Sequence, residues 1–184
     1  MKHRLLMSAF AAVAVVHAAA QSPSPAGQKL TLSGQTISAY NTIQRDLLEA
    51  AELMPEADYL FKPTPDTRPF GQLIAHVALS QFGACSLLQG GPSPKAAEKD
   101  ETPRSKAVLI ALLKESTTFC SPLVTAMTDE GMVQLIKAGP VEGARGLMPI
   151  GLVVHGNEVY GTIAVYLRLK GIVPPTTARQ NRRP

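Results

Sequence analysis

The sequence predicts an all-α protein built as a four-helix bundle. Four segments of about twenty residues repeat apolar residues at three- and four-residue steps, which is the period of an amphipathic helix. No convincing run of residues alternates between apolar and polar as a half-buried strand does. The two cysteines lie at similar depths in the second and third segments, which favours parallel directions for those two helices. We therefore expect up-down-down-up order with a long crossover between helices 2 and 3.

The chain begins with a segment typical of a signal peptide, residues 1–20. A basic start, MKHR, precedes the apolar run LLMSAFAAVAVV, and the small residues Ala18 and Ala20 suit cleavage before Gln21. The apolar run is shorter than the roughly 20 residues that a membrane-spanning helix needs, although an uncleaved anchor is the alternative. We therefore expect a periplasmic or secreted protein without an integral membrane span, cleaved near Ala20.

The rest of the chain, about 164 residues, suits one domain with a sizeable core. Between Gln21 and Pro175 there are 13 basic and 14 acidic residues, so the body is nearly neutral and has no basic stripe. This composition argues against nucleic acid as a partner. Residues 176–184 carry three arginines and are expected to form a basic disordered tail, with contact to an acidic surface as the alternative.

The first predicted helix covers residues 35–54. Before it, residues 21–34 are rich in Pro, Ser and Gly, and we interpret them as a flexible linker that leads into a bundle spanning 35–175. After it, the stretch MPEADYLFKPTPDTRPF contains four prolines, which no continuing helix could accommodate.

The remaining three helices are predicted at 69–88, 104–127 and 147–170. The connection QGGPSPKAAEKDETP after the second helix can reach roughly 50 Å, whereas a twenty-residue helix is about 30 Å long, so a crossover is feasible. Pro122 is expected to kink the third helix or to end its regular part. The stretch GIVPP, a glycine followed by prolines, stops the fourth helix.

Cys85 and Cys120 are the only cysteines in the chain. In an exported protein such a pair indicates a disulfide, and two buried free thiols are the alternative. Each cysteine lies about sixteen residues into its predicted helix, so parallel helices would place the two at one level. The bond would stabilise the fold by roughly 3–4 kcal/mol. The spacing is not that of a redox-active CxxC motif.

Two histidines lie outside the predicted signal peptide, His76 and His155, on the second and fourth predicted helices. Helical bundles often build metal sites from side chains on facing helices, and neutral imidazole binds zinc, nickel and iron. Two histidines alone are a weak signal, because a catalytic zinc normally has three protein ligands. Taken singly, a histidine among apolar residues is more often packed or hydrogen-bonded than a ligand.

Three parts of the chain together resemble the DinB-like family of four-helix-bundle metalloenzymes. They are the stretch LLEAAELMPEADYLFKPTPDTRPFGQLIAHVA, the pair Cys85 and Cys120, and the stretch VVHGNEVYGTIAVYLRLKGIVPP. The resemblance covers about residues 39–175 and is closest to exported members that share the cysteine pair and the GIVPP ending. It implies the same crossover bundle that the cysteine positions favour.

The resemblance also implies a metal site with one histidine on the second helix and an HxxxH pair on the fourth. His76 and His155 match this pattern, but position 159, where the third histidine is expected, holds valine. Glu158 lies about 100° round the helix from that position and could replace the missing ligand only after reorientation. We expect Glu158 to make a surface or interhelical polar contact instead.

Characterised members that the chain resembles are metal-dependent thiol transferases and a thiol-dependent isomerase, in which the metal lowers the pKa of a small thiol. We therefore expect an exported DinB-like protein that holds zinc, nickel or iron at His76 and His155, with thiol-transferase-like chemistry as one interpretation. The alternative is a metal-free bundle that has lost catalysis and binds a small molecule or a protein. The sequence leaves the oligomeric state open, with a homodimer as one alternative, and it assigns no catalytic residue.

Overall fold

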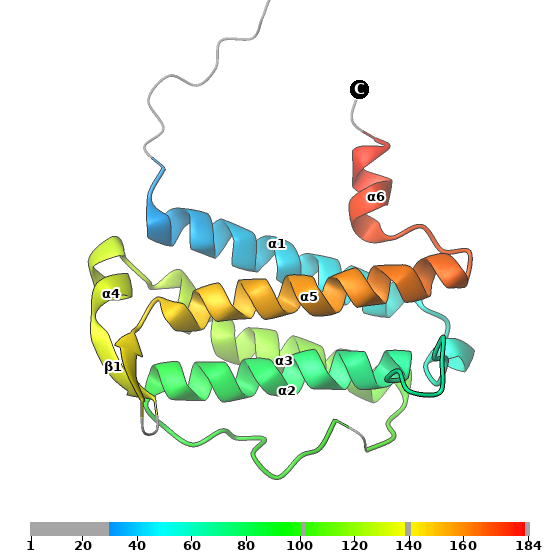
Figure 1. The fold of residues 1–184 in the computed structure, drawn as a ribbon, viewed down its shortest axis with the longest axis horizontal. Coiled ribbons are helices and arrows are strands. Elements are labelled where there is room, and N and C mark those ends of the chain that lie inside the picture. The colour runs from blue at the N-terminus through cyan, green and yellow to red at the C-terminus, as the bar shows by residue number, and fades with distance from the viewer. Residues whose placement is uncertain (1–29, 101, 139–140, 183–184) are drawn as a thin grey trace, which may run out of the picture.

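The protein is a bundle of four long helices with a small hairpin at one end (Figure 1). The computed structural model describes residues 30–100, 102–138 and 141–182, so the predicted signal peptide and most of the predicted linker lie outside the described residues. The predicted all-α fold class is confirmed. The elements, in order, are α1 Leu32–Leu53, a 3₁₀ turn Glu56–Asp58, α2 Phe70–Gln89, α3 Lys106–Thr125, α4 Asp129–Val133, β1 Leu135–Ala138, β2 Val141–Ala144, α5 Leu147–Leu169 and α6 Pro175–Gln180.

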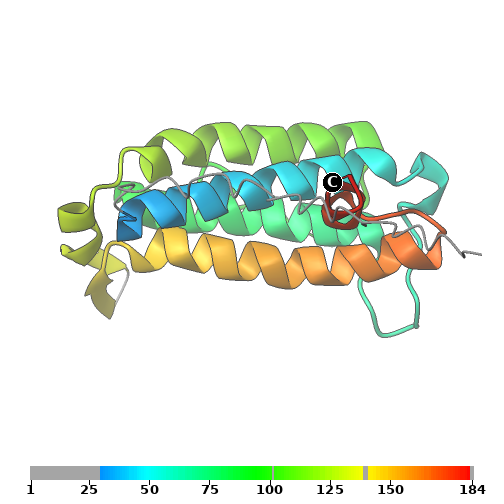
Figure 2. The same cartoon turned by 90° about the horizontal axis from the view of Figure 1, so that it is seen from above.

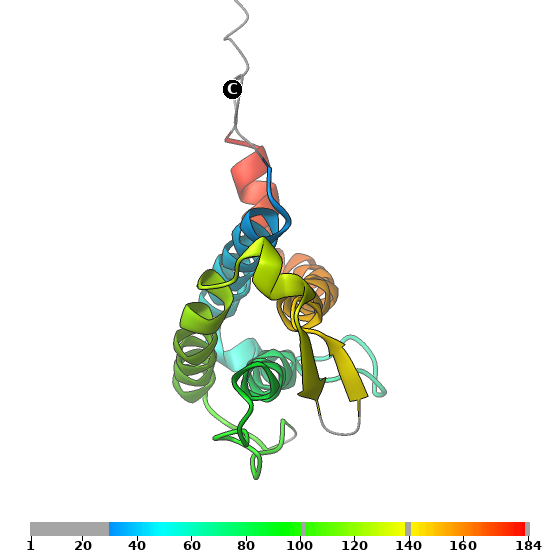
Figure 3. The same ribbon diagram turned by 90° about the vertical axis from the view of Figure 1, so that its left-hand side faces the viewer.

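Helices α2 and α3 run parallel to each other. Ser116 donates a hydrogen bond to Gln81, and four residues further along both helices Cys120 is bonded to Cys85. The residue numbers of the two helices therefore rise in the same direction. The connection between the two helices returns along the whole length of the bundle, and α1 and α5 run in the opposite direction (Figures 1 and 2). Seen from its end, the bundle places α1, α3, α2 and α5 in a ring, with α2 and α5 as neighbours (Figure 3).

Capping side chains set the starts of two of the long helices. Thr31 accepts a hydrogen bond from the backbone N–H of Gly34 at 3.1 Å, so α1 begins at Leu32, inside the stretch predicted as linker. Ser105 caps α3 in the same way. Pro122 lies inside α3, near its C-terminal end. It does not end the helix, which continues to Thr125.

A hairpin that the sequence did not predict joins α4 to α5. Strands β1 and β2 pair antiparallel with Leu135 opposite Ala144 and Lys137 opposite Glu142. Each strand has only four residues, and such short segments give too little alternation to be distinguished from a loop.

The prediction of a disordered tail over residues 176–184 is wrong for residues 176–180, which belong to helix α6, Pro175–Gln180. Arg179 of this helix forms ion pairs with Asp46 and Glu49 of α1. The side chain of Asp46 is only 6% exposed, and a carboxylate that has been removed from water requires a cationic partner. Arg179 and Arg45 together therefore balance the two carboxylates of Asp46 and Glu49.

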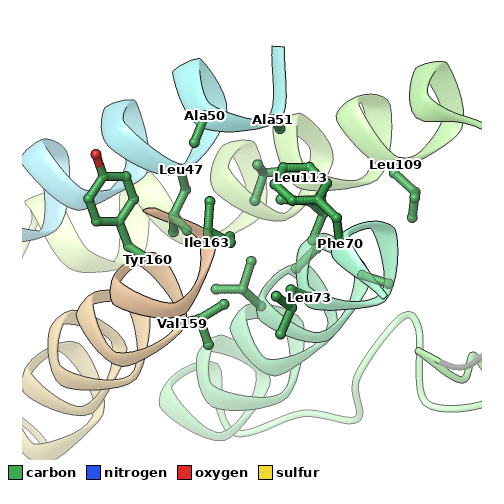
Figure 4. Close-up of a cluster of buried hydrophobic side chains, with 14 of the residues drawn as sticks. Leu47, Ala50, Ala51, Phe70, Leu73, Leu109, Leu113, Val159, Tyr160 and Ile163 are labelled. Carbon is green, nitrogen blue, oxygen red and sulfur yellow. The ribbon is translucent and has the colours of Figure 1, made fainter. Parts of the chain in front are cut away.

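The main apolar core fills the space between the four long helices (Figure 4). It includes Leu47, Phe70, Val159 and Ile163. A second buried cluster surrounds the disulfide and contains Leu152 of α5. By length and composition α2 and α3 could each cross a membrane. In the bundle, 61% of the most apolar window of α2 and 33% of that of α3 are buried.

Candidate histidine site

His76 of α2 and His155 of α5 face each other across the groove between the two helices. Their ring centroids are 5.0 Å apart and the rings meet at 75°. Both side chains are partly buried, with 28% and 32% of their surface exposed. The structure therefore brings together the two histidines that the sequence marked as candidate ligands.

Asp100, in the crossover between α2 and α3, holds the imidazole of His76. Its Oδ2 lies 2.9 Å from Nδ1 of His76 and 3.9 Å from Nε of Arg68. An ionised carboxylate can only accept a hydrogen bond, so Nδ1 of His76 is the donor. In the neutral ring this leaves the lone pair on Nε2, which is the arrangement that a metal-ligating histidine usually has. Sequence analysis missed Asp100, because nothing in a loop residue 24 positions away indicates that the chain folds back over His76.

His155 offers a nitrogen that has no partner among the described residues. Its Nε2 is buried and makes no hydrogen bond, while its Nδ1 lies 3.8 Å from Oε2 of Glu158. Burial lowers the pKa of His155 below its ordinary value of 6.5, and the neighbouring His76 lowers it further. The ring is therefore neutral near pH 7, the form that can donate a lone pair. A buried polar atom without a partner is costly, which points to a bound ion or ligand at this nitrogen.

The two residues after Asn157 do not complete a metal site. The side chain of Glu158 is 78% exposed, and its carboxylate lies near Nδ1 of His155. It therefore makes the surface contact that we expected. Val159 is 6% exposed and belongs to the main core, on the side of α5 where Ile163 also packs (Figure 4). Hydrocarbon therefore fills the position at which a third imidazole would stand.

The described residues contain no group of three or more His, Cys, Asp and Glu side chains placed to hold a metal. Two imidazoles suit zinc, nickel or iron, and the unpartnered Nε2 of His155 fits such a metal. The donor set fits an open centre with two protein ligands, and it does not fit a three-ligand catalytic zinc site.

A cavity of about 290 Å³ adjoins His155 in the groove between α2 and α5. Its walls are almost entirely hydrocarbon, with one hydroxyl and one imidazole. The lining residues are Ser80, Ala84, Leu147, Met148, Gly151, Leu152 and His155.

Comparison with known proteins agrees with this architecture. A family model described as the DinB superfamily matches residues 39–157. A search of curated proteins finds no match. Among solved structures, a DinB-like protein from Bacillus cereus superposes with a TM-score of 0.64 at 14% identity, over 77% of this chain and 95% of that chain.

Two further structures are similar in fold. A DinB-like protein from Bacillus subtilis gives a TM-score of 0.61 at 20% identity, over 74% of this chain and 92% of its own. A mutant of a mycothiol-dependent maleylpyruvate isomerase gives 0.54 at 14% identity, over 72% of this chain and 59% of its own. At these identities the likeness establishes the fold alone.

Proposed function

Because the chain belongs to the DinB superfamily, we propose that the pair His76 and His155 is its functional centre and binds a divalent metal through two imidazole nitrogens. The observation that carries the proposal is the buried Nε2 of His155, which has no partner among the described residues and lies beside a second imidazole held by Asp100. Imidazole nitrogens from two facing helices would form the protein half of a metal centre, and the other positions would be left to water and substrate.

Asp100 acts as a positioning residue in this proposal. A carboxylate that accepts the Nδ1–H of a metal-binding histidine fixes the ring and makes its other nitrogen more basic. Burial lowers the pKa of His155, which favours the neutral ring that can bind a metal. His155 therefore offers the lone pair of its buried Nε2, and the contact with Asp100 leaves Nε2 of His76 as the nitrogen that can face a metal.

The chemistry that we propose is thiol-transferase-like. A divalent metal, when bound, favours the thiolate form of a coordinated thiol. The cavity beside His155, which is open to solvent, would hold the body of a small substrate against hydrocarbon. The mycothiol-dependent isomerase among the structural neighbours supports a thiol as the substrate class, at the level of fold similarity.

A second candidate function is a metal-free bundle that binds a small molecule through the same residues. The burial of Val159 in the core favours it, because that position contributes hydrocarbon where the family pattern has a ligand. In that case the two imidazoles would make hydrogen bonds to the ligand.

We also propose that the protein acts after export. Support comes from the basic and apolar start of the chain and from the disulfide between Cys85 and Cys120, since such bonds persist in oxidising compartments.

Titration of the untagged protein with Zn²⁺ tests the metal proposal. We expect one site, with affinity reduced roughly 100-fold by His76→Ala or His155→Ala because each removes half of the protein donors. Asp100→Asn should weaken binding about tenfold, since it replaces the charged acceptor that orients His76 by a weaker, neutral amide oxygen. Isothermal titration calorimetry measures each affinity.

Glu158→Gln is the matched control, because its exposed carboxylate is predicted not to bind the metal. A large loss of affinity in this variant would make Glu158 the third ligand. Unchanged affinity in both histidine variants would contradict the metal proposal and leave the metal-free function.

A further inference from the structure

We propose that the cavity beside His155 is a subsite for a small, uncharged, mainly apolar part of the ligand, and that Gly151 keeps it open. The inference rests on the proposed function for the polar centre that adjoins the cavity. It adds the chemical class of the substrate and a residue that controls access to it.

The walls of the cavity select against charge. Its volume of about 290 Å³ lies near the lower end of the range for ligand pockets, roughly 300–1,000 Å³. Among the residues that the structure describes, no Asp, Glu, Lys or Arg lines it, and the polar groups are the hydroxyl of Ser80 and the ring of His155. A charged group here would lie against hydrocarbon and would meet no opposite charge, so an uncharged group is the better fit.

The cavity begins at His155 and extends along α2 and α5. On α2, Ser80 and Ala84 follow His76 by one and two helical turns on the same face. On α5, Gly151 precedes His155 by one turn. A ligand whose polar end meets the imidazoles therefore has its apolar body over small side chains on α2 and α5.

The glycine at position 151 has no packing role in the described part of the chain. Glycine inside a helix costs about 1 kcal/mol relative to alanine. At Gly156 the cost has a reason, because an added Cβ would lie 2.9 Å from Cγ1 of Ile43 on α1. At Gly151 an added Cβ would meet no described atom within 4 Å. Gly151 is exposed and lines the cavity, so a side chain there would stand at the mouth of the cavity.

NMR titration with benzyl alcohol tests the subsite, using EDTA-treated protein so that metal plays no part. We expect the backbone amide signals of Ser80, Ala84 and Leu152 to shift in the wild-type protein. Gly151→Leu should weaken binding at least about tenfold by filling the cavity. Benzoate and benzylamine, which have a similar size but carry charge, should bind at least about tenfold more weakly than benzyl alcohol.

Gly161→Leu is the matched control, since Gly161 lies on the same helix, is equally open and does not line the cavity. Its affinity for benzyl alcohol should match that of the wild type. Gly151→Ala, which fills less space, should give an intermediate loss and keeps the test valid if the leucine variant folds poorly.

Equal binding by Gly151→Leu and wild type, shifts that avoid the cavity residues, or tight binding of benzoate would each overturn the subsite. Because the titration contains no metal, failure here leaves the zinc result standing. Failure of zinc binding likewise leaves this titration interpretable.

Discussion

Replacing Cys85 and Cys120 together by alanine is expected to lower the free energy of unfolding by about 4 kcal/mol. The bond joins residues 35 positions apart and ties the parallel helices α2 and α3 at one level. Without it the unfolded chain regains the freedom that the closed loop denies it. Both cysteines are fully buried in the folded protein, so we expect no new contact with water to offset the loss of the bond.

Chemical denaturation of the oxidised wild type and of the double variant measures this difference. Wild-type protein that has been reduced before unfolding is the control, and it should resemble the variant. The disulfide cluster also contains Leu152, which lines the cavity, so we expect the variant to bind benzyl alcohol more weakly too. A loss of less than about 1 kcal/mol would contradict the stabilising role of this bond.

Val159→His is expected to raise the affinity for Zn²⁺ roughly 100-fold, because it supplies a third imidazole four residues after His155 on the same helix. The same change should lower the stability of the metal-free protein by about 1–3 kcal/mol, since it places a polar ring in the apolar core. Zinc should restore that stability, because it binds the folded state preferentially.

Calorimetric titration and thermal melting with and without Zn²⁺ measure both effects. Asn157→His is the matched control, because Asn157 is exposed and lies on another face of α5. An affinity unchanged by Val159→His, or raised equally by Asn157→His, would show that His76 and His155 do not converge on a metal position beside residue 159.

Most of the helical framework could be predicted from the sequence, because apolar periodicity and proline-rich breaks act locally. The four long helices begin and end within a few residues of the predicted limits. Thr31 shows why the limits differ, since a cap depends on one side chain rather than on a repeated pattern. The hairpin at 135–144 was missed because its strands are too short to show a period.

The site was predictable only in part. Residue type and family resemblance identified His76 and His155, and the structure places them side by side. Asp100 could not be found this way, because its contact with His76 depends on the path of the crossover loop. Arg179 was likewise assigned to a free tail, although it pairs with Asp46 across 133 positions of the chain. Contacts of this kind are set by tertiary structure and have no local pattern.

The most direct test of the central claim is to count the histidine ligands of the metal by X-ray absorption spectroscopy of zinc-loaded, untagged protein. We predict two imidazoles in the wild type, completed by light oxygen or sulfur ligands from solvent or an added thiol. The count should rise to three in Val159→His and fall to one in His155→Ala. A wild-type spectrum without imidazole, or one that His155→Ala leaves unchanged, would contradict a metal centre at His76 and His155.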